Sequence, residues 1–294
     1  MLFIEFDLVG AEWVIVAYKA NDPNMLEVVE SGKSPHVVTG SLISRVSEEL
    51  VEAESKLVGM ETDPVKISKL REQLPALHVG APFLPRTMSI RQCGKKANHG
   101  LNYGMKYRKF ALINEIQEAE AAKIVEAYSG KAYKRLQNYW EDTRSQIRKD
   151  RTLTNCFGRK VRLLDEYGPN LLQAAYAFVP QSTVADCVNQ ALRLAYNDTR
   201  PEFRLAHPCV QVHDSLLFAH EDKTPEILAG FCTLMTEHMR PMLCYSGEEF
   251  QLEVDVKIGT NWGKMQTIPR KASEAQIKEL FVVAVEASKQ ARRL

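Results

Sequence analysis

The pattern of apolar positions predicts strands near both ends of the chain. Residues 2–9 are apolar apart from Glu5 and Asp7, which predicts a buried strand. Two apolar runs flank the polar His-Asp-Ser at 213–215 and predict a hairpin. Residues 251–258 alternate between apolar and polar side chains, which predicts a further strand.

The residues between these strands show patterns that are typical of helices. Residues 47–74 are rich in Glu and Lys and are broken at Gly59 and Pro64, so we expect two surface helices there. Ser89 is placed to cap a helix that runs towards Asn102. The other expected helices cover residues 25–30 (between loops in the 21–40 stretch), 115–130, 131–150 and 273–293. The expected fold class is therefore α+β.

Composition narrows the class of protein. The chain has 294 residues, of which 45% are hydrophobic and 26% charged, so disordered and low-complexity classes are excluded. Its six cysteines are scattered without a C-x-x-C pair, which indicates reduced thiols in a cytosolic protein. The opening residues lack the pattern of an export signal, and no apolar stretch reaches the ~20 residues of a membrane span. We therefore expect a cytoplasmic protein with no membrane partner.

The net charge of +1 hides one strongly basic segment. Residues 83–114 contain seven Lys or Arg and no Asp or Glu. Within this segment Arg91, Lys95, His99 and Tyr103 recur every four residues, so on a helix they would share a face ~120° wide. Such a face suits a triphosphate at one end and a base at the other, and a solvated basic helix is the alternative.

Two aspartates at the ends of predicted strands suggest a metal site. Asp7 lies at the end of the first predicted strand, and Asp214 lies in the predicted hairpin. Two carboxylates at strand ends can share two Mg²⁺ ions, which in-line attack on a phosphoryl group requires. This hypothesis holds only if the fold joins the two residues.

Three segments, in this order, resemble motifs A, B and C of the family A DNA polymerases, the DNA polymerase I type. They are AspLeuValGlyAlaGlu at 7–12, the Arg-x3-Lys-x3-His-x3-Tyr-Gly run at 91–104 and GlnValHisAsp at 211–214. Further similarity is found at 152–160, 180–186 and 261–263.

The resemblance implies a polymerase palm, an antiparallel sheet with the catalytic hairpin, and mainly helical fingers, with the thumb absent. The palm would comprise residues 1–22 and 168–267. The fingers would comprise residues 23–167 with an extended insertion at 44–82, and a helical tail would cover 268–294.

The resemblance also implies DNA-directed DNA synthesis by nucleotidyl transfer of dNTPs onto a primer 3′-hydroxyl. Two Mg²⁺ ions would act, one on the hydroxyl and one on the leaving pyrophosphate. The implied metal ligands are Asp7, Asp214 and the backbone carbonyl of Leu8. Arg91 and Lys95 would hold the incoming triphosphate and neutralise charge in the transition state.

Further roles follow from matching positions. Tyr103 would border the nascent base pair, and Glu12 would lie beneath the sugar and exclude a 2′-hydroxyl. His99 belongs to the same nucleotide site but stands where the family usually has Phe or Tyr, and Ser215 stands where it usually has Glu. The residues expected to contact DNA are Gln181, Gln211, His213, Arg159 and Lys160.

Two alternatives remain open at this point. A single-subunit, phage-type RNA polymerase shares the Arg-x3-Lys-x7-Tyr-Gly spacing and the HisAspSer motif, but it has a small residue where Glu12 stands. A non-catalytic DNA-binding subunit is the other alternative. We expect the chain to act as part of a split or truncated polymerase, together with a second chain that supplies a thumb and an exonuclease. The other expected partners are primer-template DNA and dNTPs, and the expected location is the nucleoid or a phage-infected cell.

Overall fold

The structure is a computed structural model that describes residues 1–77, 84–222, 224–270 and 272–290. It combines helices with an antiparallel sheet, so the predicted α+β class is confirmed. None of the helices in the described ranges combines the length and apolar character needed to cross a bilayer.

The chain divides into two compact units. Unit 1 contains Met1–Ala11 and Gln181–Leu294, and unit 2 contains Glu12–Pro180. The division falls inside the long helix α10 (Pro169–Asn197), at Pro180. Proline has no backbone N–H to donate to the preceding turn, so it is a natural break in such a helix. The palm and finger boundaries expected at residues 22 and 168 stay predictions.

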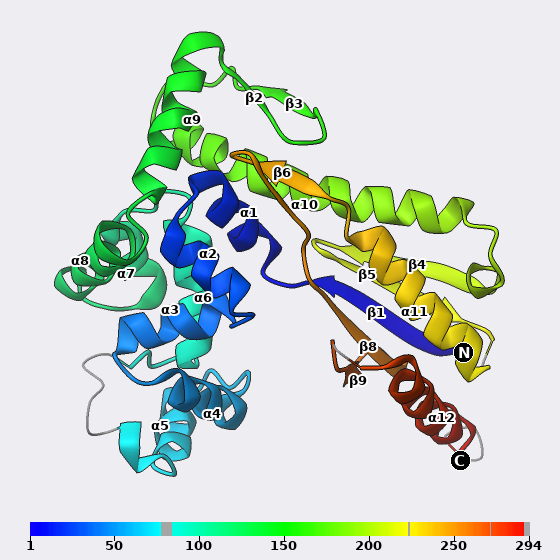
Figure 1. The fold of residues 1–294 in the computed structure, drawn as a ribbon. Coiled ribbons are helices and arrows are strands. Elements are labelled where there is room, and N and C mark those ends of the chain that lie inside the picture. The colour runs from blue at the N-terminus through cyan, green and yellow to red at the C-terminus, as the bar shows by residue number, and fades with distance from the viewer. Residues whose placement is uncertain (78–83, 223, 271, 291–294) are drawn as a thin grey trace. The chain divides into compact units, whose positions relative to one another are not determined.

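A five-stranded antiparallel sheet forms the centre of unit 1, in the order β4-β5-β1-β8-β9. Its strands are β1 (Leu2–Leu8), β4 (Ala206–Val212), β5 (Ser215–His220), β8 (Val254–Asn261) and β9 (Lys264–Ile268). Figure 1 shows β1 in blue between β5 and β8. The predicted first strand and hairpin are confirmed, whereas β8 begins three residues later than expected and β9 was not predicted.

One face of this sheet carries the core of unit 1. Side chains alternate across β1, so Leu2, Ile4, Phe6 and Leu8 are buried while the residues between them are half-buried. The helices α11 (Pro225–Met239) and α12 (Glu274–Gln290) pack against the sheet (Figure 1). Three phenylalanine rings meet edge to face at the centre, with centroids 5.3–6.1 Å apart: Phe6, Phe218 and Phe231.

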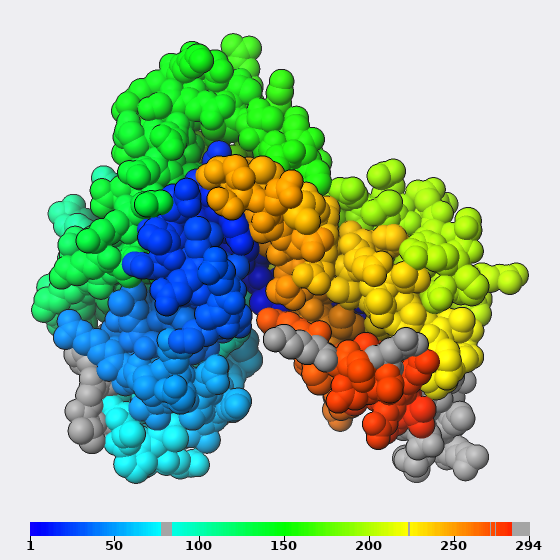
Figure 2. All heavy atoms as spheres, viewed as in Figure 1, coloured from blue at the N-terminus to red at the C-terminus, as the bar shows by residue number. Residues whose placement is uncertain are grey.

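Unit 2 is mainly helical. Besides the first part of α10, its helices are α1 (Ala11–Ala20), α2 (Pro23–Glu30), α3 (Pro35–Ser44), α4 (Glu48–Val58), α5 (Pro64–Arg71), α6 (Ile90–Leu101), α7 (Tyr107–Asn114), α8 (Glu118–Val125) and α9 (Leu136–Asp150). The two predicted surface helices are confirmed as α4 and α5, and they lie at the surface of the unit (Figure 2). Ser47 and Asp63 cap them through their side chains.

Two sequence expectations in unit 2 were wrong. Residues 35–40, expected as a loop, begin helix α3, because Pro35 occupies the first helical turn and Val37 and Gly40 are buried. The single helix expected over 115–130 is formed by two elements: the α-helix α8, which ends at Val125, and the π-helix η2 (Glu126–Ala132) that follows it. Helix α7 was not predicted.

The remaining elements are short. They are the hairpin β2 (Thr152–Thr154) with β3 (Lys160–Arg162), the hairpin β6 (Leu243–Tyr245) with β7 (Glu248–Phe250), and the 3-10 turns η1 (Pro75–Leu77) and η3 (Pro201–Phe203).

Truncating the central aromatic cluster should destabilise the chain. Phe231→Ala removes a fully buried ring that contacts Phe6 and Phe218, so we expect a loss of about 3–5 kcal/mol in the free energy of unfolding. Tyr196→Ala is the control, because that side chain is 84% exposed and its loss should change stability by less than ~0.5 kcal/mol. Urea denaturation followed by circular dichroism measures both, and equal effects would contradict this description of the core.

Candidate active site

Asp7 and Asp214 are brought together by strand pairing in unit 1. In the antiparallel pairing of β1 with β5, Asp7 lies opposite Ser215, the residue after Asp214. The backbone N–H of Leu8 donates to the carbonyl oxygen of Asp214, at 3.0 Å. His213 takes a left-handed conformation, with φ of 54°, in the tight turn before Asp214. Two carboxylates distant in sequence thus lie at neighbouring positions.

Asp7 lies in an electrostatic environment that disfavours its charge. Burial and the negative charge of Asp214 raise the pKa of Asp7 from 3.8 to about 6, and Lys257 opposes this effect. The Lys257 ammonium forms an ion pair with Glu5, at 2.7 Å. Its charge is therefore shared with a second carboxylate, and Asp7 remains under-neutralised.

A third aspartate faces Asp7 but is already paired. Asp255 on β8 lies directly opposite Asp7, and its carboxylate accepts a hydrogen bond from Nε of Arg270, at 2.6 Å. Asp255 is therefore neutralised by Arg270, whereas the negative charges of Asp7 and Asp214 are not balanced. A cation bound between these two carboxylates would balance them.

The chemistry of this donor set fits magnesium. Among the described residues, no group of three or more His, Cys, Asp or Glu side chains is arranged to hold a metal ion. Magnesium is usually bound by one or two carboxylates, while water and substrate phosphates complete its octahedral shell. The pair Asp7 and Asp214 suits such an ion and does not suit a closed structural zinc site. The role of the Leu8 carbonyl stays a prediction.

In unit 2, helix α6 presents the basic residues that the sequence singled out. Ser89 caps the helix, its Oγ accepting the N–H of Gln92 at 3.2 Å, as the sequence predicted. Lys95 and His99 are exposed and Arg91 is half-buried on the same face. The helix ends at Leu101, so the fourth residue of the predicted stripe, Tyr103, lies just beyond it.

A buried polar network fixes the side of α6 that packs into unit 2. The hydroxyl of Tyr128 lies 2.8 Å from Oδ1 of both Asn98 and Asn102. Thr39 on α3 donates to Oδ1 of Asn98 at 2.7 Å, and Trp13 on α1 donates to the Tyr128 hydroxyl at 3.3 Å. Because all these groups are buried and satisfied, they restrict the rotation of α6 and hold its basic face outward.

The predicted sugar-site residues also come together. Glu12 lies in the first turn of α1, and its Oε2 accepts a hydrogen bond from the Tyr103 hydroxyl. Nδ1 of His99 lies 3.7 Å from the same oxygen, and the His99 and Tyr103 rings meet edge to face. Burial and the charge of Glu12 raise the pKa of Tyr103, so its hydroxyl stays a donor.

His36, which the sequence analysis did not single out, lies close to the basic residues of α6. It lies on α3, and burial together with the charges of Arg91, Lys95 and His99 lowers its pKa from 6.5 to about 4. Nδ2 of Asn98 lies 3.1 Å from Nδ1 of His36. An amide NH₂ group can only donate, so Nδ1 is the acceptor and the ring proton lies on Nε2. His36 is thus a neutral hydrogen-bond donor beside two cations.

The position of His36 depends on the close packing of α3 against α6, and the sequence did not predict this packing because residues 35–40 were expected to form a loop. A Cβ on Gly94 would lie 2.2 Å from the carbonyl oxygen of His36, so only glycine fits there. The usable sequence signal was Gly94 in a helix together with Gly40 in a segment that was assigned to a loop.

The residues expected to contact DNA lie on exposed parts of both units. In unit 1, Gln181 is exposed on α10, and Gln211 on β4 donates to Asn189 of α10, at 3.0 Å. His213 is exposed in the β4–β5 turn. In unit 2, Arg159 and Lys160 are exposed at the β2–β3 hairpin. Their roles stay predictions.

Comparison with known proteins identifies the class. The family model "DNA polymerase family A" matches residues 79–264, which is more than half of the chain. The chain therefore belongs to DNA polymerase family A, as its motifs predicted.

The relatives are distant and much longer. The chain is 23% identical over 267 residues to the thermostable DNA polymerase I of Thermus aquaticus, covering 89% of this chain and 27% of that protein. It is 23% identical over 263 residues to the corresponding enzyme of Thermus thermophilus, covering 88% and 26%. The chain thus spans about a quarter of the length of these curated relatives.

A solved structure shares the fold. The POL domain of Pol1 from M. smegmatis, in a complex with DNA primer-template and dNTP, superposes with a TM-score of 0.65 at 23% identity. The match covers 89% of this chain and 40% of that one.

The raised pKa of Asp7 predicts a dependence of stability on pH. The folded chain keeps the Asp7 proton up to about pH 6 and the unfolded chain loses it near pH 4, so stability should fall as pH rises between these values. Asp7→Asn should remove this fall and make the chain about 1–2 kcal/mol more stable above pH 6.5, a value reduced because Asp7 is partly exposed. Added Mg²⁺ should raise the melting temperature of the wild type but not of Asp7→Asn.

Thermal denaturation from pH 4.5 to 8, with and without Mg²⁺, measures both effects. Glu249→Gln, which removes an exposed carboxylate on β7, should leave both unchanged. Identical pH profiles for the wild type and Asp7→Asn would contradict the electrostatic description of this pair.

Proposed function

We propose that this chain performs template-directed DNA synthesis, transferring dNTPs onto a primer 3′-hydroxyl with the help of two Mg²⁺ ions. The observation that carries the proposal is the pairing of β1 with β5, which sets Asp7 beside Asp214 with an excess of negative charge. Membership of DNA polymerase family A supports it. So does the solved neighbour, whose complex contains primer-template DNA and a dNTP.

The proposed metal ligands are the carboxylates of Asp7 and Asp214 and the carbonyl of Leu8. Magnesium bound there would promote ionisation of the attacking hydroxyl and neutralise charge on the phosphates. The chain's own contribution is a rigid placement of the ligands, since both aspartates are attached to paired strands.

The proposed triphosphate site lies on α6. Arg91 and Lys95 would pair with phosphate oxygens, and Nε2–H of His36 would add an uncharged donor. A neutral imidazole beside two cations avoids further repulsion and can still donate a hydrogen bond. The cations would also neutralise the charge that develops on the leaving pyrophosphate.

The proposed sugar site is the contact of Glu12 with Tyr103. The hydrogen bond from Tyr103 holds the carboxylate in one orientation, with His99 nearby. A 2′-hydroxyl would meet this fixed side chain, which favours dNTPs over rNTPs. This arrangement favours a DNA polymerase over the RNA polymerase alternative.

DNA binding is proposed through Gln181, Gln211, His213, Arg159 and Lys160. Contacts from Arg and Lys to phosphates are independent of sequence and weaken as salt rises. We also propose that the chain acts in DNA replication, in the cytoplasm, together with a second chain that supplies a thumb. Co-purification from the native source tests whether this second chain exists.

Removing one proposed metal ligand should separate chemistry from binding. Asp214→Asn should lower single-nucleotide addition roughly 10³-fold or more, because a metal ligand is lost. DNA affinity in low salt should change by less than about twofold, because no phosphate contact is removed. Primer extension under single-turnover conditions and fluorescence anisotropy measure the two quantities. Glu249→Gln is the matched control, and loss of DNA binding with normal chemistry on the DNA still bound would refute the assignment.

Truncating Glu12 should relax sugar selection. The wild type should prefer dNTPs, and Glu12→Ala should raise rNTP use relative to dNTP use by roughly tenfold or more, since space opens for the 2′-hydroxyl. The ratio of the two incorporation efficiencies is the measurement. Glu27→Ala, at an exposed glutamate of α2, should leave the ratio unchanged. An unchanged ratio in Glu12→Ala would mean that Glu12 does not select the sugar.

A further inference from the structure

A buried ion pair lies outside the motifs that carry the proposed chemistry. Glu54 on α4 and Arg71 on α5 have side chains that are 0% and 7% exposed. Nε and Nη2 of Arg71 donate to the same carboxylate oxygen of Glu54, at 2.9 and 2.6 Å. Both residues precede the part of the chain that the family model matches.

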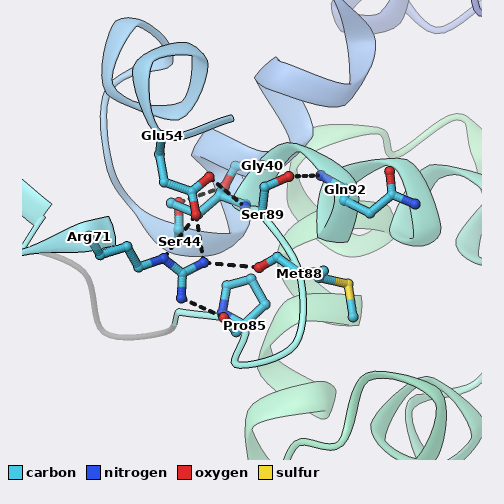
Figure 3. Close-up of polar contacts among 9 residues, drawn as sticks. Gly40, Ser44, Glu54, Arg71, Pro85, Met88, Ser89 and Gln92 are labelled. Atoms are coloured by element: carbon cyan, nitrogen blue, oxygen red, sulfur yellow. Dashed lines mark hydrogen bonds and ion pairs between the residues drawn. The ribbon is translucent and has the colours of Figure 1, made fainter. Parts of the chain in front are cut away.

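The remaining hydrogen bonds of this pair reach the backbone around the start of α6. Nη1 of Arg71 donates to the carbonyl of Pro85 at 2.6 Å, and Nη2 donates to the carbonyl of Met88 at 3.0 Å (Figure 3). The second carboxylate oxygen of Glu54 accepts the N–H of Ile90, at 2.9 Å. The pair thus binds both the segment that enters α6 and the first residue of the helix.

One of these contacts adds to the capping of α6. The first N–H groups of a helix have no partner within the helix. Ser89 accepts the N–H of Gln92, and Glu54 on α4 accepts that of Ile90, so one residue of the 48–71 region takes part in capping the start of the helix. A carboxylate at this end is also favoured by the helix dipole.

A buried ion pair is a poor way to gain stability alone. Removing two charges from water costs about as much as their attraction returns, and well-packed apolar residues often do as well or better. What apolar residues could not reproduce is the set of three backbone contacts at Pro85, Met88 and Ile90. The value of the pair therefore lies in what it positions.

We propose that the Glu54–Arg71 pair is a positioning device for the nucleotide site: it fixes the first turn of α6 and thereby the guanidinium of Arg91. Arg91 directly follows Ile90, and Lys95 lies about one turn further along the same helix. Neither Glu54 nor Arg71 is a catalytic residue. The inference rests on the proposed function, because it assigns the triphosphate to this face of α6.

The test compares single and double variants of the full chain. Glu54→Gln and Arg71→Met each leave one buried charge without its partner, so each should lower the melting temperature by roughly 10 °C. The double variant Glu54→Leu/Arg71→Met leaves no buried charge, so its melting temperature should return to within a few degrees of the wild type. The backbone contacts at the start of α6 are nevertheless lost.

The decisive measurement is binding of Mg²⁺–dATP to each variant by equilibrium dialysis. The double variant should bind at least about fivefold more weakly than the wild type in spite of its restored stability, whereas its affinity for primer-template DNA should be unchanged. In single-nucleotide addition, the apparent KM for dATP should rise by a similar factor and kcat should change less.

Two controls separate positioning from general damage. Ile67→Ala removes a buried side chain of α5 and should lower the melting temperature without weakening dATP binding. Glu48→Gln breaks the exposed pair of α4 with Lys33 and should change nothing. If dATP binding follows stability, so that the double variant binds like the wild type or Ile67→Ala binds as weakly as Glu54→Gln, the positioning role is overturned.

Failure of the proposed function would look different. If the wild type binds no Mg²⁺–dATP, or if Arg91→Ala binds it as well as the wild type, the triphosphate site itself is wrong and the positioning role falls with it. Normal binding by the wild type, weak binding by Arg91→Ala and normal binding by the double variant would overturn the positioning role alone.

Discussion

The pairing of β1 with both of its neighbours is the constraint on which the candidate catalytic centre depends. As the central strand it alternates strictly, with Leu2, Ile4, Phe6 and Leu8 buried in the core. A shift of register by one residue would expose the apolar set and bury Glu5 and Asp7. The burial that stabilises the sheet therefore also fixes which side chain lies beside Asp214. The arrangement has a cost, because Asp7 is held where its charged form is disfavoured, and carboxylates with perturbed pKa values are typical of functional sites.

Much of this could be predicted from the sequence, because the signals were local. Alternation in residues 2–8 and the apolar runs around Asp214 identified the strands, and the capping residue Ser89 identified a helix start. The motif residues were found by their spacing. Their roles nonetheless stay predictions, because spacing shows which side chains share a face and not what they bind.

The rest depended on contacts between distant segments. Helix α3 has a weak amphipathic signal of its own, and it is stabilised by packing of Gly40 and Pro35 against α6. Once α3 was assigned to a loop, His36 could not be placed beside Arg91. The Glu54–Arg71 pair was invisible for the same reason, because charged residues in surface helices are normally solvated. Only the fold shows that these two are buried.

The two candidate sites carry charges of opposite sign. The negative site in unit 1 suits the proposed metal ions, and the positive site in unit 2 suits the proposed triphosphate. In unit 1 the neighbouring cations Lys257 and Arg270 form ion pairs with Glu5 and Asp255, which leaves Asp7 and Asp214 available for the proposed metal ions. In unit 2 the carboxylate of Glu54 is paired with Arg71 and also accepts the N–H of Ile90 at the start of α6. These ion pairs neutralise the neighbouring charges of opposite sign. Negative charge therefore remains at the aspartate pair of unit 1, and positive charge remains on helix α6 of unit 2.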